Sequence, residues 1–450
     1  MGSQIEFTTA YANLLNSYWL RLRGAGVREV EFMPRVPRWL WKAGNVFVVA
    51  AALAWRRILP GPRVITVTGS TGKTTAKECL RVILSTHFPV VATAGSDNGR
   101  RGLPRLLLKA RRSHRFVLAE VGILKPGRMW RSALMLRPDI VVITSVGRQH
   151  MRDFRVLETV AREKAKLLRP LTQRGFAVLN GDDPRVAAMS NPSRFPTVWF
   201  GTSPGFDVWS SDVSFAWPGR LSFTVHAGGE SERVHTQFVG AHWVPSVLAA
   251  IATALRCGVT LRQAAEAVAR VAPWEARLQP VPLPSGAVML RDENNGTVET
   301  FRKALDVMRT AKGLRRMAVV GTISDHPEGY EAAVRQIGRE LASAAEVAIF
   351  VGERSRAGPE AAREAGMQSE NLHWFPNARS VADFLRKETR RGDLVLLKGT
   401  WDDHLPRIYF AQLGTVECWR ERCLLMPVCG DCRHLGFRPD QPLSGNGGKE

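Results

Sequence analysis

The sequence lacks the features of a secreted protein and an apolar run of the usual membrane-spanning length. Its six cysteines do not form a disulfide framework, because four of them crowd the C-terminus. Its longest apolar run, residues 43–55, falls short of the ~20 residues that a spanning helix needs. No basic segment leads directly into an apolar run and a small-residue cleavage site, so we expect no signal peptide. The expected compartment is the cytoplasm.

Acidic residues are also scarce. The 450 residues include 63 Lys and Arg against 41 Asp and Glu, a formal net charge of +22. This excess favours anionic partners such as nucleotides, nucleic acid or an acidic lipid surface. Only 12 of the basic residues are lysines and no low-complexity basic tract occurs, so we do not expect nucleic acid to be a main partner. The length predicts about three domains.

Two successive alternations of apolar runs and helical patterns predict two α/β domains. The first, at residues 63–278, is expected to contain a parallel sheet covered on both faces, with a small antiparallel addition at 206–238. The second, at 279–415, is expected to be an open, Rossmann-like domain. The predicted strands of the first domain include the runs at 64–68, 116–121, 139–144 and 176–180.

The two ends of the chain depart from this pattern. Residues 1–62 form a basic N-terminal segment with a predicted helix, and residues 39–57 place Trp and basic side chains around the apolar run. These features suit a helix at a membrane surface, a buried helix packed on the next domain, or a short true span, and the sequence does not choose among them. Residues 416–450 form a cysteine-containing tail.

The thiols of this tail have the spacing C-x4-C-x5-C-x2-C. Four thiolates satisfy a closed tetrahedral zinc site, so structural zinc is one prediction. Uncommitted thiols, an iron–sulfur cluster or a redox pair are the alternatives. The residues concerned are Cys418, Cys423, Cys429 and Cys432.

The most informative motif is a phosphate-binding loop, T-G-S-T-G-K-T-T, which directly follows the predicted strand 64–68 and opens a helix. Glycines let backbone N–H groups surround phosphate oxygens, and the helix N-terminus adds its positive dipole end. Lys73 neutralises phosphoryl charge, and the Thr74 hydroxyl is a candidate magnesium ligand. The predicted ATP-binding residues here are Gly69, Ser70, Thr71, Gly72, Lys73, Thr74 and Thr75.

This loop and the motifs that follow it resemble the Mur ligase family, the ATP-dependent amide-forming enzymes of peptidoglycan synthesis. The likeness is strongest to the members that add D-alanyl-D-alanine to a tripeptide precursor. The family's T-G-x-x-G-K-T-T loop is matched at every position, and residues 93–104 resemble its next motif, with Ser96 and Gly99 where the family has Asn. The resemblance runs from about residue 63 to 414 and does not include the family's N-terminal uridine-binding module.

The resemblance implies a magnesium site beside the loop. Glu120 and His150 stand where the family places metal ligands, and Lys164 stands where it has a lysine that is carbamylated by carbon dioxide. A carbamate makes the lysine anionic, as a second Mg²⁺ requires. Without the family, the segment around Lys164 would be interpreted as a solvated helix face.

Further matches imply nucleotide contacts. His242 and Ser246 occupy a motif in which the family has a His and an adenine-contacting Asn, so Ser246 is a departure. Arg277 takes the place of the arginine that opens the last domain. Asp292 and Asn295 remain from the family's D-x-Y-N-A-N-P motif, whose Tyr, second Asn and Pro are absent.

The implied activity is ATP-dependent amide formation. The γ-phosphoryl group of ATP would activate a carboxylate as an acyl phosphate for attack by an amine, with Lys73, Glu120, His150 and Lys164 as catalytic residues. The expected substrates are small-molecule or lipid-linked precursors of the cell envelope. Two alternatives stay open: a non-catalytic nucleotide-binding relative that acts as a scaffold, and an ATPase at a membrane or nucleic-acid surface.

Overall fold

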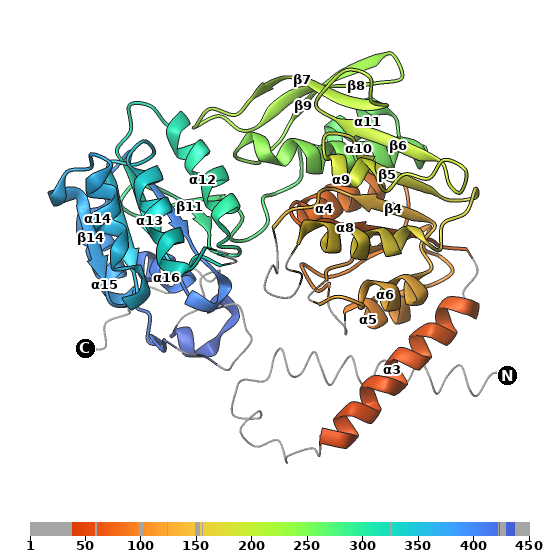
Figure 1. Ribbon diagram of the computed structural model, residues 1–450, viewed down its shortest axis with the longest axis horizontal. Coiled ribbons are helices and arrows are strands. Elements are labelled where there is room, and N and C mark those ends of the chain that lie inside the picture. The colour runs from red at the N-terminus through yellow and green to blue at the C-terminus, as the bar shows by residue number, and fades with distance from the viewer. Residues whose placement is uncertain are drawn as a thin grey trace, which may run out of the picture.

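The protein is built from two α/β domains that lie side by side, with an additional helix against the first (Figure 1). A computed structural model provides the coordinates. It describes residues 38–58, 61–98, 102–123, 125–148, 154, 156–324, 326, 328–421, 423 and 429–436.

The middle domain contains a nine-stranded sheet with the order β2-β3-β1-β4-β5-β6-β7-β8-β9. Neighbours pair in parallel from β2 through β7, and β8 and β9 add in antiparallel fashion. The prediction of a parallel sheet with a small antiparallel addition is confirmed. The strands are β1 (Arg63–Thr68), β2 (Val90–Ala92), β3 (Phe116–Glu120), β4 (Ile140–Ile143), β5 (Phe176–Asn180), β6 (Thr197–Gly201), β7 (Val208–Ser214), β8 (Ser222–Ala227) and β9 (Glu230–His235).

Helices cover both faces of this sheet, which explains why its central strands are continuously apolar. Alternate residues of β1 show the two faces: Ile65 and Val67 belong to one core cluster, and Val64 to the other. The first face is covered by α4 (Lys73–Ser85), α10 (Val244–Arg256) and α11 (Leu261–Val268). The second is covered by α5 (Gly102–Lys109), α6 (Met129–Leu136), α8 (Leu157–Ala165) and α9 (Pro184–Ala187).

Helix α3 (Arg38–Ile58) lies against α5 and α6 at the edge of the domain (Figure 1). Ala52 is fully buried there, and the Trp55 indole Nε1 donates a hydrogen bond to the Ala110 carbonyl at 2.9 Å. The helix is thus attached to the domain through its C-terminal half. In the described part of the chain, no helix has the length and hydropathy to cross a bilayer.

The C-terminal domain contains a six-stranded sheet with the order β10-β11-β15-β12-β13-β14, parallel except for the edge pair β10 and β11. Its strands are β10 (Gln279–Pro282), β11 (Val288–Asp292), β12 (Arg316–Val320), β13 (Val347–Val351), β14 (Leu372–Phe375) and β15 (Leu394–Lys398). One face is covered by α12 (Val298–Thr310), α13 (Tyr330–Leu341) and α14 (Ala357–Glu364), and the other by α15 (Ala378–Glu388) and α16 (Pro406–Leu413). The predicted Rossmann-like architecture is confirmed.

Candidate active site

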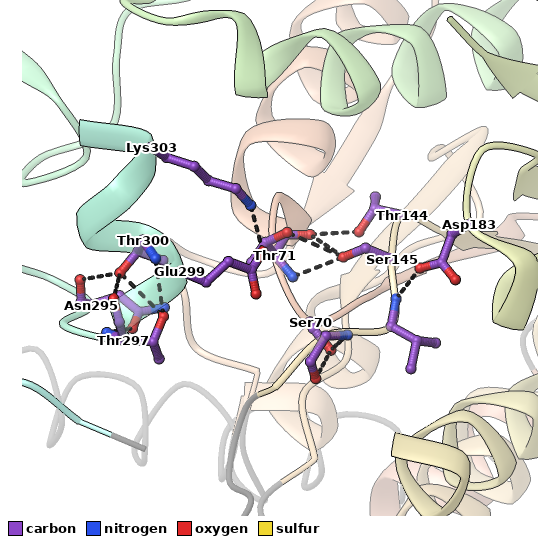
Figure 2. Close-up of polar contacts among 12 residues, drawn as sticks. Ser70, Thr71, Thr144, Ser145, Asp183, Asn295, Thr297, Glu299, Thr300 and Lys303 are labelled. Carbon is purple, nitrogen blue, oxygen red and sulfur yellow. Dashed lines mark hydrogen bonds and ion pairs between the residues drawn. The ribbon is translucent and has the colours of Figure 1, made fainter. Parts of the chain in front are cut away.

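The phosphate loop joins the carboxyl end of β1 to α4 and is bonded to the segment that follows β4 (Figure 2). The backbone N–H of Ser70 donates to the Ser145 carbonyl at 2.9 Å, and the N–H of Thr71 to the Ser145 Oγ at 3.0 Å. The Thr144 hydroxyl donates to the Thr71 carbonyl at 2.6 Å. These bonds restrain the backbone of the loop.

Two glycines of the loop are required by their surroundings. A Cβ added to Gly69 would lie 1.9 Å from the Thr144 Oγ1, too close for any side chain. Gly72 has φ +79°, and its Cβ would lie 2.3 Å from the Ser246 Oγ. Ser246 on α10 therefore packs directly under the loop, although it does not match the family residue at that position.

Lys73 begins α4 and folds back over the loop. Its Nζ donates to the carbonyls of Gly69 at 2.8 Å and Ser70 at 3.1 Å. Burial lowers the pKa of Lys73 to about 8; the Glu120 carboxylate opposes this shift and Arg277 adds to it. The ammonium thus lacks a full counter-charge, which a phosphate would supply.

Glu120 ends β3 beside the loop and is 1 % exposed. Its Oε1 accepts a hydrogen bond from the Asn98 amide at 2.8 Å. Its Oε2 is buried and has no hydrogen-bond partner in the described part of the chain. A buried carboxylate oxygen of this kind is a suitable ligand for a hard cation such as Mg²⁺.

Arg277 links the phosphate loop to the start of the C-terminal domain. Its Nη2 donates to the Thr74 hydroxyl at 3.4 Å, while its buried Nε has no partner among the residues that the structure describes. Burial lowers the pKa of Arg277, against the attraction of Glu120 and Asp292. The guanidinium therefore has donor capacity left for an anion.

Lys164 lies on α8 and is 2 % exposed. Burial, and then the charge of Lys73, lower the pKa of Lys164 well below its ordinary value. The interpretation of this segment as a solvated helix face is wrong, because both Glu163 and Lys164 are buried inside the domain. Sequence periodicity does not distinguish a charged residue on an inward face from one on an outward face.

The predicted magnesium ligands are only partly described. Thr74 and Glu120 both lie at the loop, and both interact with Arg277. The guanidinium of Arg277 donates a hydrogen bond to the Thr74 hydroxyl and is attracted by the Glu120 carboxylate. His150 lies outside the described residues. Within the described ranges, no group of three or more His, Cys, Asp or Glu side chains could hold a metal. The buried Glu120 Oε2, which has no hydrogen-bond partner among the described residues, is the feature of this site that fits a bound cation.

Asp292 and Asn295 surround a buried lysine of the C-terminal domain. The Lys398 Nζ lies 2.7 Å from the Asp292 Oδ2 and donates to the Asn295 carbonyl at 2.5 Å. Asp292 also accepts the backbone N–H of Leu278 at 3.1 Å. Burial raises the pKa of Asp292 and lowers the pKa of Lys398, each opposed by the other's charge. The cluster holds the residues after β11 in place.

His242 lies in the 3-10 turn Ala241–Trp243 that precedes α10. Burial lowers the pKa of His242 to about 3, with smaller contributions from Lys303 and Lys398. The imidazole is therefore neutral near pH 7. The neutral imidazole can accept or donate a hydrogen bond.

Several residues of the site were not selected from the sequence. Thr144 and Ser145 bond to the phosphate loop. Glu299, on the first turn of α12, points toward the loop and pairs with Lys303 at 2.7 Å (Figure 2). The sequence signal that could have indicated Thr144 and Ser145 is their position directly after a predicted strand, because residues just after parallel strands meet at one edge of a sheet.

Among the described residues of the cysteine tail, no three potential metal ligands lie together. Cys429 lies 3.5 Å from the His404 Nδ1, and burial raises the pKa of Cys429. All four tail cysteines are described and carry free thiols. Because no three potential ligands come together in the described ranges, the structure lends the zinc prediction no support.

Comparison with known proteins shows the family to which the chain belongs. The family model described as Mur ligase middle domain matches residues 67–254, and that described as Mur ligase, glutamate ligase domain matches residues 276–401. The chain is 30% identical over 375 residues to the UDP-N-acetylmuramoyl-tripeptide–D-alanyl-D-alanine ligase of Mycobacterium tuberculosis, covering 78% of this chain and 73% of that enzyme. The enzyme of the same name from Bacillus subtilis is 25% identical over 341 residues, covering 76% and 73%. The chain therefore belongs to the Mur ligase family.

Solved structures agree on the fold. A crystal structure of MurF from Acinetobacter baumannii has a TM-score of 0.75 at 24% identity and covers 82% of this chain and 80% of that one. MurF ligase from Thermotoga maritima in complex with ADP has a TM-score of 0.71 at 20% identity, covering 82% and 83%. The predictions of a Mur ligase fold and of an ATP-dependent ligase of this family are confirmed.

Proposed function

We propose that this chain activates a carboxylate of a cell-wall precursor with ATP and joins it to an amine, with D-alanyl-D-alanine as the first amine to test. The observation that supports this most is the convergence of Lys73, Arg277 and Glu120 on the phosphate loop, each with unsatisfied charge or hydrogen-bonding capacity. Relatives named as D-alanyl-D-alanine ligases supply the choice of amine.

The residues would divide the work as follows. Backbone N–H groups of the loop and Lys73 bind the phosphates, and Arg277 neutralises charge from the side of the C-terminal domain. Thr74, Glu120, His150 and carbamylated Lys164 would hold Mg²⁺, which supplies further charge neutralisation when bound. Catalysis then consists chiefly of positioning, as is general for phosphoryl transfer.

The carbamate on Lys164 is a separate proposal. Its support is that Lys164 is buried, has a lowered pKa and has Lys73, a like charge, as its neighbour. A lowered pKa leaves more neutral amine, the form that reacts with carbon dioxide, and an anionic carbamate would remove the repulsion. Labelling with ¹³C-bicarbonate should give a carbamate NMR signal that a Lys164→Arg variant lacks; a signal unchanged in the variant contradicts the assignment.

We propose two alternative forms of the substrate that carries the carboxylate. The relatives' names point to a nucleotide-linked tripeptide, whereas the basic residues 39–57 favour a substrate presented at a membrane surface, including a lipid-linked one. A nucleotide-linked substrate would place the enzyme in the cytoplasm, as the sequence predicts. Parallel assays with both substrate forms decide between them.

The activity is tested by phosphate release with ATP and Mg²⁺. We expect release only when carboxylate and amine are both supplied, together with a condensation product in the mass spectrum. Lys73→Ala should lower the rate at least ~100-fold, since it removes a cation aimed at the transferred group. The matched control is Lys312→Ala, which replaces an exposed lysine in the turn between α12 and β12 and should leave the rate unchanged.

Two results would contradict the proposal. Full activity of the Lys73→Ala variant excludes the loop as the reacting site. Phosphate release that needs only polynucleotide or anionic vesicles, without a condensation product, identifies an ATPase instead.

A further inference from the structure

Exposed apolar side chains collect on one side of the middle domain. Among the described residues, five of the six large hydrophobic side chains that are exposed lie on α3, on α6 or directly before α8. Trp130 and Leu134 of α6 are 37 % and 47 % exposed, and Ile58 at the end of α3 is 63 % exposed. The sixth, Val213, lies on β7 in the antiparallel part of the sheet.

These elements form one continuous surface, which we call the α3–α6–α8 face. The Arg56 guanidinium of α3 donates to the carbonyls of Leu136 at 2.9 Å and Arg137 at 3.1 Å, at the end of α6. Helix α6 in turn contacts α8 and the 3-10 turn Lys166–Leu168 that follows it. Figure 1 shows α3 running past α5 and α6 at the same side of the domain.

The face is strongly basic. Residues 38–58 and 125–137 contain no Asp or Glu. Exposed acids are few: Glu158 on α8 is paired with Arg185 at 3.0 Å. The exposed arginines of the face are Arg57, Arg131, Arg137, Arg162 and Arg169.

Aromatic and cationic groups are combined at its centre. The Arg169 guanidinium lies over the Trp130 ring, 5.5 Å from its centroid. Tryptophan prefers the boundary between apolar and aqueous surroundings, and arginine beside it can bind a phosphate. Leu134 stands one helical turn beyond Trp130 on the same helix face.

We propose that the α3–α6–α8 face docks on an anionic lipid bilayer. The match is one of charge and polarity, because exposed apolar side chains among exposed arginines fit acyl chains below anionic headgroups. A second copy of the chain fits less well, since a two-fold contact would oppose arginine to arginine. The proposal extends the membrane-surface proposal for residues 39–57 and does not depend on the ligase activity.

The test is co-sedimentation of the full chain with phosphatidylcholine vesicles, with and without phosphatidylglycerol. We expect binding only to the anionic vesicles, weakened by salt. R131E/R169E should lower the apparent affinity at least roughly tenfold, since each basic group near such a surface contributes about a fivefold factor. W130S/L134S should also weaken binding. R262E/R363E on α11 and α14, and V213S on β7, are the matched controls and should bind as the wild type.

The proposal is overturned by equal binding to both vesicle types, by no binding, or by wild-type binding of R131E/R169E or W130S/L134S. It is also overturned if the chain self-associates through this face and R131E/R169E abolishes only that association. ATP affinity and thermal melting of every variant should equal those of the wild type, which separates loss of docking from misfolding. Failure here leaves the ligase proposal intact, because no substrate is present in the assay.

Discussion

At the scale of single residues, Lys73 shows how a phosphate site is prepared by burial. The ammonium bonds to two carbonyls of its own loop and receives only partial compensation from Glu120. A bound phosphate would supply the missing negative charge and return the pKa of Lys73 toward its ordinary value of 10.5. Nucleotide binding should therefore be coupled to protonation.

We expect proton uptake on ATP binding between pH 8 and the ordinary lysine value. In this range Lys73 is largely neutral in the free protein and charged in the complex, so affinity falls as pH rises above about 8, by up to tenfold per pH unit. Below pH 8 the lysine is protonated in both states and this dependence disappears. Calorimetry in buffers of different ionisation enthalpy measures the uptake; equal heats in all buffers at pH 9 would contradict it.

A second residue-scale prediction concerns Gly72. Gly72→Ala combines an unfavourable positive φ with a collision against the Ser246 Oγ, so we expect loss of ATP binding and destabilisation of more than ~2 kcal/mol. Gly127 has the same φ of +79° and open space around its Cβ. Gly127→Ala therefore isolates the backbone cost, about 1 kcal/mol. Chemical denaturation of the two variants compares them, and equal losses would show that the collision is relieved.

At the scale of elements, the carboxyl ends of β1, β3 and β4 bring together residues that are far apart in the chain. The sequence was sufficient to predict the strands and their parallel sheet from the apolar runs, and the loop motif marks where β1 ends. Only the resemblance to the family indicated that Glu120 lies beside the loop, and the apolar runs of the sequence alone carried no such information. The sequence was not sufficient to predict the bonds from Thr144 and Ser145, since hydroxyl residues after a strand carry no local signal of their partner. The burial of Lys164 on α8 has no signal in the periodicity either, and only the resemblance to the family indicated a role for this residue.

The Asp292–Lys398 pair gives a prediction at this scale, since it ties the last residue of β15 to the last residue of β11. Lys398→Met leaves Asp292 buried without its cation and should cost roughly 3–5 kcal/mol of unfolding free energy. Adding Asp292→Asn should recover a large part of that loss. A double-mutant cycle by denaturant unfolding measures the coupling; additive effects of the two changes would contradict a direct pair.

At the scale of the whole molecule, Arg277 joins the domains at the site itself. Arg277 lies in the segment that precedes β10, and its guanidinium donates a hydrogen bond to Thr74 of the middle domain. The guanidinium is also attracted by the charge of Asp292 in the C-terminal domain. This contact could not be predicted from periodicity, because it depends on how two separately folded domains meet. Only the resemblance to the family indicated that Arg277 has a role.

Arg277 should therefore couple nucleotide binding to both domains. In the wild type we expect ATP to slow hydrogen exchange at the phosphate loop and at the first turn of α12. In Arg277→Ala we expect protection of the loop alone and ATP affinity lower by about tenfold or more. Arg262→Ala on α11 is the control. Protection of α12 that persists in Arg277→Ala would show that the coupling runs elsewhere.

The hydrogen bonds from Thr144 and Ser145 to the phosphate loop have one more consequence. Because they restrain the backbone of the loop, part of the entropy cost of ordering the loop is met during folding and not when a ligand binds. We therefore expect the association rates for ATP and for inorganic triphosphate to be limited by diffusion and by removal of hydration water, and not by ordering of the loop.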